Sequence, residues 1–186
     1  MAVATAPARR KRRWNPAVEW VVVVVIALGA AFVVRTFVFQ QYVINGPSMR
    51  PTLQPGDRVL LNKLSYRVHD VNRGDVVVFD RVQGTRHDDL IKRVIALEGE
   101  TIRIENCTVF VDGEELAEPY LADDVRGGRC GATSMAPLTV PDGQVFVMGD
   151  NRPESSDSRA FGPIDVDEIR GRAFVVLWPA GNWRWL

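Results

Sequence analysis

The stretch Gly46-Pro47-Ser48-Met49-Arg50-Pro51-Thr52-Leu53 opens the mixed polar part of the chain, shortly after a strongly apolar segment. Proline fixes its own φ and pushes the residue before it toward extended geometry. Gly46 and Arg50 each precede a proline, so the backbone around Ser48 is expected to be rigid and non-helical. A serine that attacks a substrate needs such a fixed presentation. The same residue types dominate ordinary turns, so this stretch alone also fits a plain turn between two strands.

Charge is distributed unevenly along the 186 residues. Lysine plus arginine equals aspartate plus glutamate, 23 each, but residues 1–16 hold five basic residues and no acid. These are Arg9, Arg10, Lys11, Arg12 and Arg13. The tail therefore carries +5 and residues 17–186 carry −5, so no basic patch and no nucleic-acid partner are expected for the main part of the chain. The length suits one membrane segment and one domain of about 150 residues.

The apolar segment, residues 17–34, reads AVEWVVVVVIALGAAFVV with Glu19 as its only charge. As a helix it rises about 27 Å, close to the roughly 30 Å hydrocarbon core of a bilayer. We expect an uncleaved transmembrane anchor over residues 17–35, with the basic tail 1–16 in the cytoplasm and the remaining chain outside it. A cleavable signal peptide shares this charge pattern, but the run is long and lacks a clean pair of small residues at its end. A buried core helix is disfavoured by the run of valines.

From Phe39 onward, short apolar runs alternate with turn signals, which is typical of β-strands. Asp112-Gly113 and Asp142-Gly143 are two of the expected turns. After the anchor no helical period is sustained, and only a short helical turn near residues 166–169 is expected. The expected strands are residues 41–44, 58–63, 75–80, 90–97, 101–105, 108–111, 144–148 and 172–178. The sequence predicts a mainly β fold: a single N-terminal transmembrane helix, then an antiparallel, barrel-like catalytic domain.

Residues 98–141 are expected to form a small inserted subdomain between two core segments, 36–97 and 142–186. This insertion holds a predicted hairpin, a polar loop and both cysteines, Cys107 and Cys130. Outside the cytoplasm a disulfide between them is expected, worth about 3.5 kcal/mol by chain entropy. Two free thiols are the alternative, and two thiols without nearby histidines do not form a metal site.

The inventory of chemical groups is short. Both histidines, His69 and His87, lie in polar surroundings that favour exposed loops, so a Ser-His-Asp triad is not expected. There is no Gly-x-Ser-x-Gly elbow, no phosphate loop and no paired-histidine metal motif.

Lys92 lies in an apolar strand pattern, Leu90-Ile91-Lys92-Arg93-Val94-Ile95-Ala96-Leu97. Alternation puts Lys92 on one face of this strand and Arg93 on the other. Burial disfavours the ammonium form and lowers the pKa of lysine, and a neutral lysine can serve as general base for a serine. The alternative is a lysine that reaches out to water at a sheet edge.

A third stretch, residues 148–162, reads MGDNRPESSDSRAFG and follows an expected strand. It is dense in hydrogen-bonding side chains. It is either a solvated connection or the shell of groups that orients a catalytic lysine.

Together these stretches resemble the bacterial type I signal peptidase family. The segment Pro47-Ser48-Met49-x-Pro51 is similar to the nucleophile box, residues 74–79 to the following strand, and Lys92-Arg93-Val94-Ile95 to the lysine box. The last box corresponds to residues 149–159. The order, the spacing and the N-terminal apolar segment agree over nearly the whole chain from that segment onward.

The resemblance implies a serine endopeptidase that removes signal peptides after small-x-small motifs by way of an acyl-enzyme. Ser48 would be the nucleophile, Lys92 the general base, and Ser155 the residue that orients the lysine. The N–H of Ser48 would bind the oxyanion, and Met49 would line a substrate pocket. The supporting polar network would comprise Arg93, Asp150, Asn151, Asp157 and Arg159. No metal or cofactor is implied.

One position departs from some family members, which carry a serine two residues before the nucleophile. Gly46 stands there and offers no hydroxyl, so a second oxyanion donor would be another group, such as the N–H of Gly46, or absent. The short insertion and single anchor resemble the compact enzymes of Gram-positive bacteria. This resemblance implies the outer face of the plasma membrane. Because signal peptides are cut near that surface, residues 37–39, Trp183 and Trp185 are expected to contact lipid. The enzyme is expected to work beside the protein-export translocon, and a monomer suffices for the mechanism. Those tryptophans could instead pack on the domain.

Two other functions compete with this one. A related serine–lysine protease that cleaves itself or a narrow partner would be favoured by an internal autocleavage loop, for which Cys130-Gly131 is a faint candidate, but the anchor argues against it. A membrane-tethered β module without activity would not require Ser48, Lys92 and Ser155 together.

Overall fold

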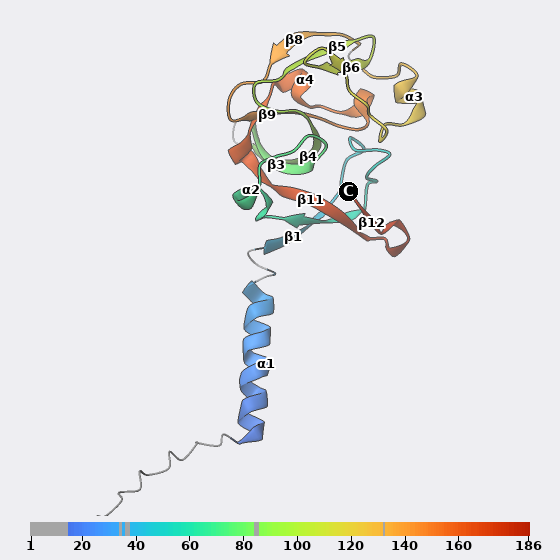
Figure 1. Ribbon diagram of the computed structural model, residues 1–186. Helices are drawn as coiled ribbons and strands as arrows, with labels where there is room; N and C mark the ends of the chain where they lie inside the picture. Colours follow the sequence, from blue (N-terminus) through green and yellow to red (C-terminus); the bar gives the residue numbers. More distant parts are fainter. Residues whose placement is uncertain (1–14, 34, 36–37, 84–85, 132) are drawn as a thin grey trace, which may run out of the picture.

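The computed structural model describes residues 15–33, 35, 38–83, 86–131 and 133–186. The basic cluster of the tail, Trp14 and Phe37 lie outside these residues. The helix α1 spans Pro16–Val33, 18 residues, and Figure 1 shows it as a rod that stands clear of the strands. Its apolar side chains point into the surroundings, with Trp20 and Ile26 exposed by 72% and 65%. In the described part of the chain, no helix meets the length and apolarity that a membrane crossing requires.

The main sheet has eight antiparallel strands in the order β1-β2-β11-β3-β4-β9-β10, with β12 paired to β11. The strands are β1 Phe39–Val43, β2 Arg58–Asn62, β3 Val76–Gln83, β4 Arg86–Ala96, β9 Gln144–Met148, β10 Ile164–Asp165, β11 Ile169–Trp178 and β12 Arg184–Trp185. Among the described strands β1 and β10 are the two ends of this path, so the sheet is open and the expected closure is not found. β1 lies at the end of the domain nearest α1 (Figure 1).

A second sheet of four antiparallel strands, in the order β7-β6-β5-β8, lies in the opposite half of the domain from α1 (Figure 1). Its strands are β5 Thr101–Glu105, β6 Thr108–Val111, β7 Glu114–Glu115 and β8 Met135–Thr139. The short helices are α2 Ser65–Val68, α3 Asp123–Arg126, α4 Ser158–Phe161, and the 3-10 turns η2 Arg152–Glu154, η3 Val166–Glu168 and η4 Ala180–Asn182. Ile102 and Val109 of the second sheet pack with Phe146 and Met148 of β9, so one apolar cluster joins the two sheets.

Alternation and turn residues located most strands well. The predicted strands 101–105, 108–111 and 144–148 are confirmed to the residue, and the helical turn near 166–169 is present as η3. The strands β7, β8, β10 and β12 and the helices α2, α3 and α4 were not predicted. Three of these strands have two residues each, and β8 carries a proline and a largely exposed face, so neither length nor alternation marks them.

Candidate active site

Ser48 lies in the turn after β1, and hydrogen bonds and buried side chains hold the backbone of this turn in place. The Arg50 N–H donates to the carbonyl of Pro47 at 3.1 Å, and the Leu53 N–H donates to that of Met49 at 2.8 Å. Met49 and Leu53 are both fully buried in the cluster under this turn. Met49 therefore packs in the core and is not among the residues that line the cleft at Ser48, in contrast to the expectation that it would line a substrate pocket. Ser48 itself is half-buried.

Lys92 projects from β4 toward this serine. Its Nζ lies 2.9 Å from Ser48 Oγ and donates to the carbonyl of Ile91, also at 2.9 Å. The residue is only 3% exposed, so the alternative of a lysine that reaches out to water is wrong. Burial lowers the pKa of Lys92 from 10.5 to about 8, against the opposing charges of Asp157 and Asp150. About half of this amine is therefore uncharged near pH 8, and the uncharged form is the one that a general base requires.

On the other face of β4, Arg93 anchors the loop that follows β9, residues 149–159. Its Nε and Nη2 donate to the two carboxylate oxygens of Asp150 at 2.9 and 2.7 Å. Asp150 is fully buried and Arg93 is 7% exposed. Nη1 also donates to the carbonyl of Gly74 at 2.9 Å. This two-point pair fixes the start of the loop.

A second buried pair fixes the end of the same loop. Arg159 donates to both oxygens of Asp157, at 2.8 and 2.9 Å. Asp157 in turn accepts from the Gly149 N–H at 2.9 Å and caps α4 by accepting from the Arg159 N–H at 3.3 Å. The hydrogen bond between Gly149 and Asp157 thus joins the first residues of the loop to the last.

Asn151 joins the loop to the nucleophile turn. Its backbone N–H donates to the carbonyl of Ser48 at 3.0 Å, and its Nδ2 donates to the carbonyl of Pro47 at 3.1 Å. The loop therefore sets the position of the serine through its backbone.

Ser155 lies beside this junction but does not contact the lysine by a hydrogen bond. Its Oγ is buried and has no hydrogen-bond partner among the described residues. A Cβ built on Gly149 would come within 2.2 Å of that Oγ and 2.5 Å of the Ser48 carbonyl. The expected hydrogen bond from Ser155 to Lys92 is therefore not made here, because the hydroxyl is packed against Gly149.

A cleft of about 430 Å³ opens next to the serine–lysine pair. It runs between the end of β1 and the outer half of β4, and it is lined by Tyr42, Val43, Ile44, Asn45, Gly46, Ser48, Val78, Asp88, Asp89, Leu90, Ile91 and Lys92. The floor contributed by Ile44, Val78 and Ile91 is apolar. In the described strands the half of β4 before Arg93 pairs with β3 alone, so one edge of β4 faces the cleft.

Neither histidine lines this cleft. His69 lines a separate hollow with Tyr66 and Glu98, at an exposed position after α2. His87 lies on β4 and not in a loop, with its side chain 63% exposed and its Nδ1 3.1 Å from Asp80. Neither position serves Ser48.

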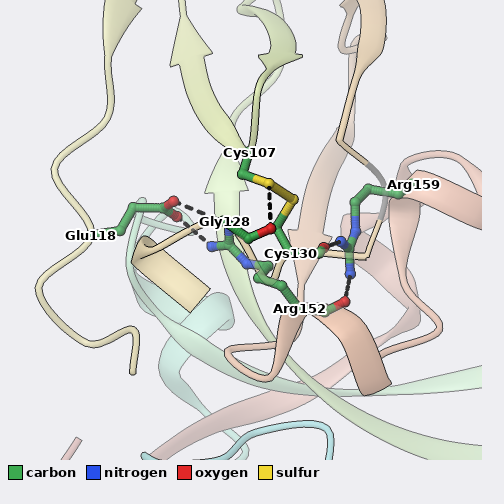
Figure 2. The surroundings of a disulfide bond; sticks show 6 residues. All are labelled: Cys107, Glu118, Gly128, Cys130, Arg152 and Arg159. Carbon is green, nitrogen blue, oxygen red and sulfur yellow. Dashed lines mark hydrogen bonds and ion pairs between the residues drawn. A yellow bond between two sulfur atoms is a disulfide. The ribbon is translucent and has the colours of Figure 1, made fainter. Parts of the chain in front are cut away.

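Cys107 and Cys130 form a disulfide with their Cα atoms 5.5 Å apart (Figure 2). Cys130 is buried, and its carbonyl accepts from Arg159 Nη1 at 2.9 Å. Figure 2 shows the disulfide next to Arg152 and Arg159, so it lies close to the loop 149–159.

Two functional neighbours were missed by the sequence analysis: Glu118 and Tyr120. Glu118 makes a two-point ion pair with Arg152, and both side chains are almost completely buried. Tyr120 lies over the guanidinium of Arg93 at 4.0 Å. No alternation or motif in the sequence distinguishes these two residues from the exposed residues around them, so their burial could not be predicted.

Comparison with known proteins places the chain in a family. The family described as "Signal peptidase, peptidase S26" matches residues 17–178. Signal peptidase I of Bacillus licheniformis is 35% identical over 170 residues, covering 89% of this chain and 90% of that protein. Signal peptidase I of Bacillus amyloliquefaciens is 36% identical over 179 residues, covering 94% and 92%. The crystal structure of a signal peptidase I from Enterococcus faecalis is 31% identical with a TM-score of 0.47, covering 56% of this chain and 97% of that one.

Proposed function

The chain belongs to the signal peptidase family, peptidase S26, and from this premise we propose that it removes signal peptides from exported preproteins with Ser48 as nucleophile and Lys92 as general base. One observation carries the proposal: the Nζ of a buried lysine lies 2.9 Å from the serine hydroxyl at the mouth of a cleft. Burial keeps the pKa of Lys92 near 8, so a neutral amine is available to accept the proton.

In the first half of the reaction, Ser48 Oγ attacks the scissile carbonyl and its proton passes to Lys92 Nζ. The resulting ammonium gives this proton to the leaving amine of the mature protein, so an acyl-enzyme remains and the lysine is neutral again. In the second half, Lys92 takes a proton from water, and the resulting hydroxide attacks the ester carbonyl. The bond to Ser48 Oγ then breaks, Lys92 returns its proton to this oxygen, and the signal peptide leaves as a free acid. Both halves use one base, so no histidine is required.

The oxyanion would be bound by the backbone of the nucleophile turn. The amide N–H of Ser48 donates to no acceptor within the described residues, so it is available for this purpose. Gly46 lines the cleft but has no hydroxyl to contribute.

We propose that Ser155 and the loop 149–159 orient Ser48 and Lys92. Ser155 Oγ is buried against Gly149, near the Ser48 carbonyl, and has no hydrogen-bond partner among the described residues, so its hydroxyl is available for this role. Arg93–Asp150 and Arg159–Asp157 hold the two ends of the loop, and Asn151 carries its position to the serine.

The cleft supports recognition of an extended peptide with small side chains near the cut. An extended segment placed between β1 and β4 would meet the free edge of β4 and an apolar floor. A floor built from Ile44, Val78 and Ile91 favours small apolar side chains, in accordance with cutting after small-x-small motifs.

We further propose that residues 17–35 anchor the enzyme in the plasma membrane, with the basic tail 1–16 in the cytoplasm and the catalytic domain outside. The apolar side chains of α1 are exposed along its length, and lipid would cover this apolar surface. Phe39 of β1, Phe174 of β11 and Trp185 of β12 form an aromatic cluster with Trp183, which directly precedes β12. The three strands lie in the half of the domain nearest α1 (Figure 1). Trp183 and Trp185 remain 57% and 66% exposed, which suits a lipid interface.

Within the domain, we assign the catalytic core to residues 36–97 and 142–186 and the inserted subdomain to residues 98–141. A monomer contains every group of the mechanism. We place the enzyme beside the protein-export translocon, where signal peptides emerge, because its substrate site lies outside the membrane.

The test is cleavage of a purified preprotein in detergent by the wild type and by Ser48→Ala, Lys92→Ala and His87→Ala, with the product N-terminus sequenced. We expect the first two substitutions to abolish cleavage after a small-x-small motif and the third to leave it unchanged. Near-full activity of Lys92→Ala would refute the mechanism. Absence of cleavage by any form, with lipid present, would favour a binding module without activity.

A further inference from the structure

Three arginines with buried side chains surround the loop 149–159, and each is contacted both by the loop and by the inserted segment, residues 98–141. Arg93 and Arg159 hold the two acids of the loop, and Arg152 donates from within the loop to the Gly149 carbonyl at 3.1 Å. Each of the three is also held from outside by the inserted segment. The contacts come from Tyr120, Glu118 and the carbonyl of Cys130.

The strongest of these contacts is the ion pair between Glu118 and Arg152 (Figure 2). Arg152 donates from both terminal nitrogens to the two oxygens of Glu118, and the side chains are 2% and 8% exposed. Burial acts to lower the pKa of Arg152, but the hydrogen bonds and charge of Glu118 outweigh it and raise the pKa. Tyr120 OH donates to the same carboxylate at 2.7 Å. This two-point pair holds the Arg152 guanidinium in a fixed position, with its Nε next to the Gly149 carbonyl.

The second contact lies on Arg93. The ring of Tyr120 covers its guanidinium at 4.0 Å, so one aromatic side chain joins the Glu118–Arg152 pair to the Arg93–Asp150 pair.

The third contact is made by the backbone next to the disulfide. The Cys130 carbonyl accepts from Arg159 Nη1 at 2.9 Å, while Arg159 Nη2 donates to the Arg152 carbonyl at 2.6 Å. Gly131 follows with φ +75°, and a Cβ there would lie 3.1 Å from the Arg152 carbonyl and 3.2 Å from the Pro153 Cα. The disulfide to Cys107, in the turn between β5 and β6, links Cys130 and Gly131 to the second sheet.

We propose that Glu118, Tyr120 and Cys130 form a clamp by which the inserted subdomain positions the catalytic loop 149–159, and that Glu118 is its principal positioning residue. The clamp touches neither substrate nor the reacting atoms. It acts through Arg152 on Gly149, and from the adjacent Asn151 on the carbonyls of Pro47 and Ser48. This inference rests on the proposed function for its effect on catalysis, but the clamp itself can be tested without substrate.

Loosening the clamp has a defined consequence at Lys92. Water reaching the loop would hydrate the lysine, and because burial is the largest cause of its lowered pKa, hydration raises that pKa. Less neutral amine is then present at a given pH, and the serine carbonyl loses its fixed position.

The experiment uses the full chain in detergent with two matched pairs of variants. Glu118→Gln places an amide N–H₂ against one Arg152 donor, whereas Glu114→Gln changes an exposed glutamate on β7 of the same insertion. Gly131→Ala puts a methyl group against the loop backbone, whereas Gly128→Ala, at φ +109°, bears similar backbone strain with no atom within 4 Å of the new Cβ. Replacing both cysteines by serine releases the third contact.

The first readout is amide hydrogen exchange of residues 149–159 without substrate. We expect exchange to quicken about tenfold or more in Glu118→Gln, Gly131→Ala and the double cysteine variant, and to stay unchanged in the two controls. Unchanged exchange in both Glu118→Gln and Gly131→Ala would overturn the clamp, whether or not the wild type cleaves a preprotein. Failure of the wild type to cleave would refute the proposed function instead.

The second readout is the kinetics of cleavage by variants that thermal unfolding shows to be folded. We expect kcat to fall about 10- to 100-fold with KM nearly unchanged, since the cleft residues are untouched. The rising limb of the pH profile should also move to higher pH. A merely structural role would lower the active fraction without moving this limb, and that outcome, or wild-type kcat with quickened exchange, would overturn the positioning role.

Discussion

Replacing Lys92 by methionine should stabilise the protein at neutral pH while abolishing cleavage. The wild type holds a lysine that is 3% exposed and whose pKa falls from 10.5 to about 8 by burial. Between these two values the unfolded chain binds more protons than the folded one, so stability rises with pH in that window. Below pH 8 the folded protein bears the full cost of a buried ammonium, and above pH 10.5 it bears none. Methionine fills a similar volume and carries no charge.

The magnitude follows from the two pKa values. The gap between 10.5 and about 8, at about 1.4 kcal/mol for each pKa unit, corresponds to about 3 kcal/mol at pH 7. At pH 10 the lysine is almost entirely neutral in the folded state but still mostly charged in the unfolded state, and under about 1 kcal/mol remains. The two contacts of Nζ, to Ile91 and Ser48, oppose the gain by about 1 kcal/mol each at most. Lys92→Met should therefore be more stable than the wild type at pH 7 by roughly 1–2 kcal/mol and lose this advantage by pH 10.

Thermal unfolding of the two proteins in the same detergent, followed at pH 7 and pH 10, measures this difference. For a chain of this size 1 kcal/mol moves Tm by roughly 2–4 °C, so the Tm difference should change by roughly 5–10 °C between the two pH values. Lys63→Met, at a partly exposed lysine, controls for the change of side chain. A Tm difference that is the same at both pH values would refute the reasoning, because the cost would then not come from the lysine charge.

Three further predictions follow from the same groups. The kcat/KM of the wild type should rise about tenfold per pH unit below pH 8 and level off above it, because only neutral Lys92 accepts the serine proton; a flat profile from pH 6 to 8 would exclude the lysine as base. Gly46→Ser should be tolerated, since a Cβ there meets no atom within 4 Å, and should raise kcat about tenfold by adding an oxyanion donor, whereas an unchanged kcat would show that the hydroxyl does not reach the oxyanion. Asp150→Asn should lower stability by about 3 kcal/mol in thermal unfolding, because it leaves the charge of Arg93 buried without a counter-ion, while Asp142→Asn at an exposed turn should not.

The core of the fold was readable from local patterns. Strands that bury one face alternate in the sequence, which is why residues 101–105 and 108–111 were located to the residue. The apolar strand around Lys92 left two positions open for its side chain, burial or an edge that reaches water, and the structure shows burial. Its distance from Ser48 did not, because 44 residues separate them and periodicity says nothing about tertiary contacts. Only the resemblance to a family with the same motif order and spacing predicts that Ser48 and Lys92 lie together.

The contact of Glu118 with Arg152 could not be predicted from the sequence, for a different reason. Glu118 follows Glu114 and Glu115, which are exposed, and the three glutamates look alike in the sequence. What buries Glu118 is Arg152, a residue 34 positions away on another element. In the same way Met49 resembled a pocket residue by family likeness, but its side chain fills the core because the turn around Ser48 must be held from below.

The electrostatics of the site explain why so many arginines surround one lysine. A carboxylate near Lys92 favours its ammonium form, and Asp157 and Asp150 both act to raise the pKa of Lys92. In the low-dielectric interior, unpaired carboxylates at these positions would raise the pKa of Lys92 and offset the lowering by burial, so the lysine would stay protonated. Each acid is instead paired with an arginine, Arg159 or Arg93, and Arg159 itself acts to lower the pKa of Lys92. Since Tyr120 and Cys130 hold these two arginines in place, the reactivity of Lys92 depends on a segment that lies outside the reaction centre.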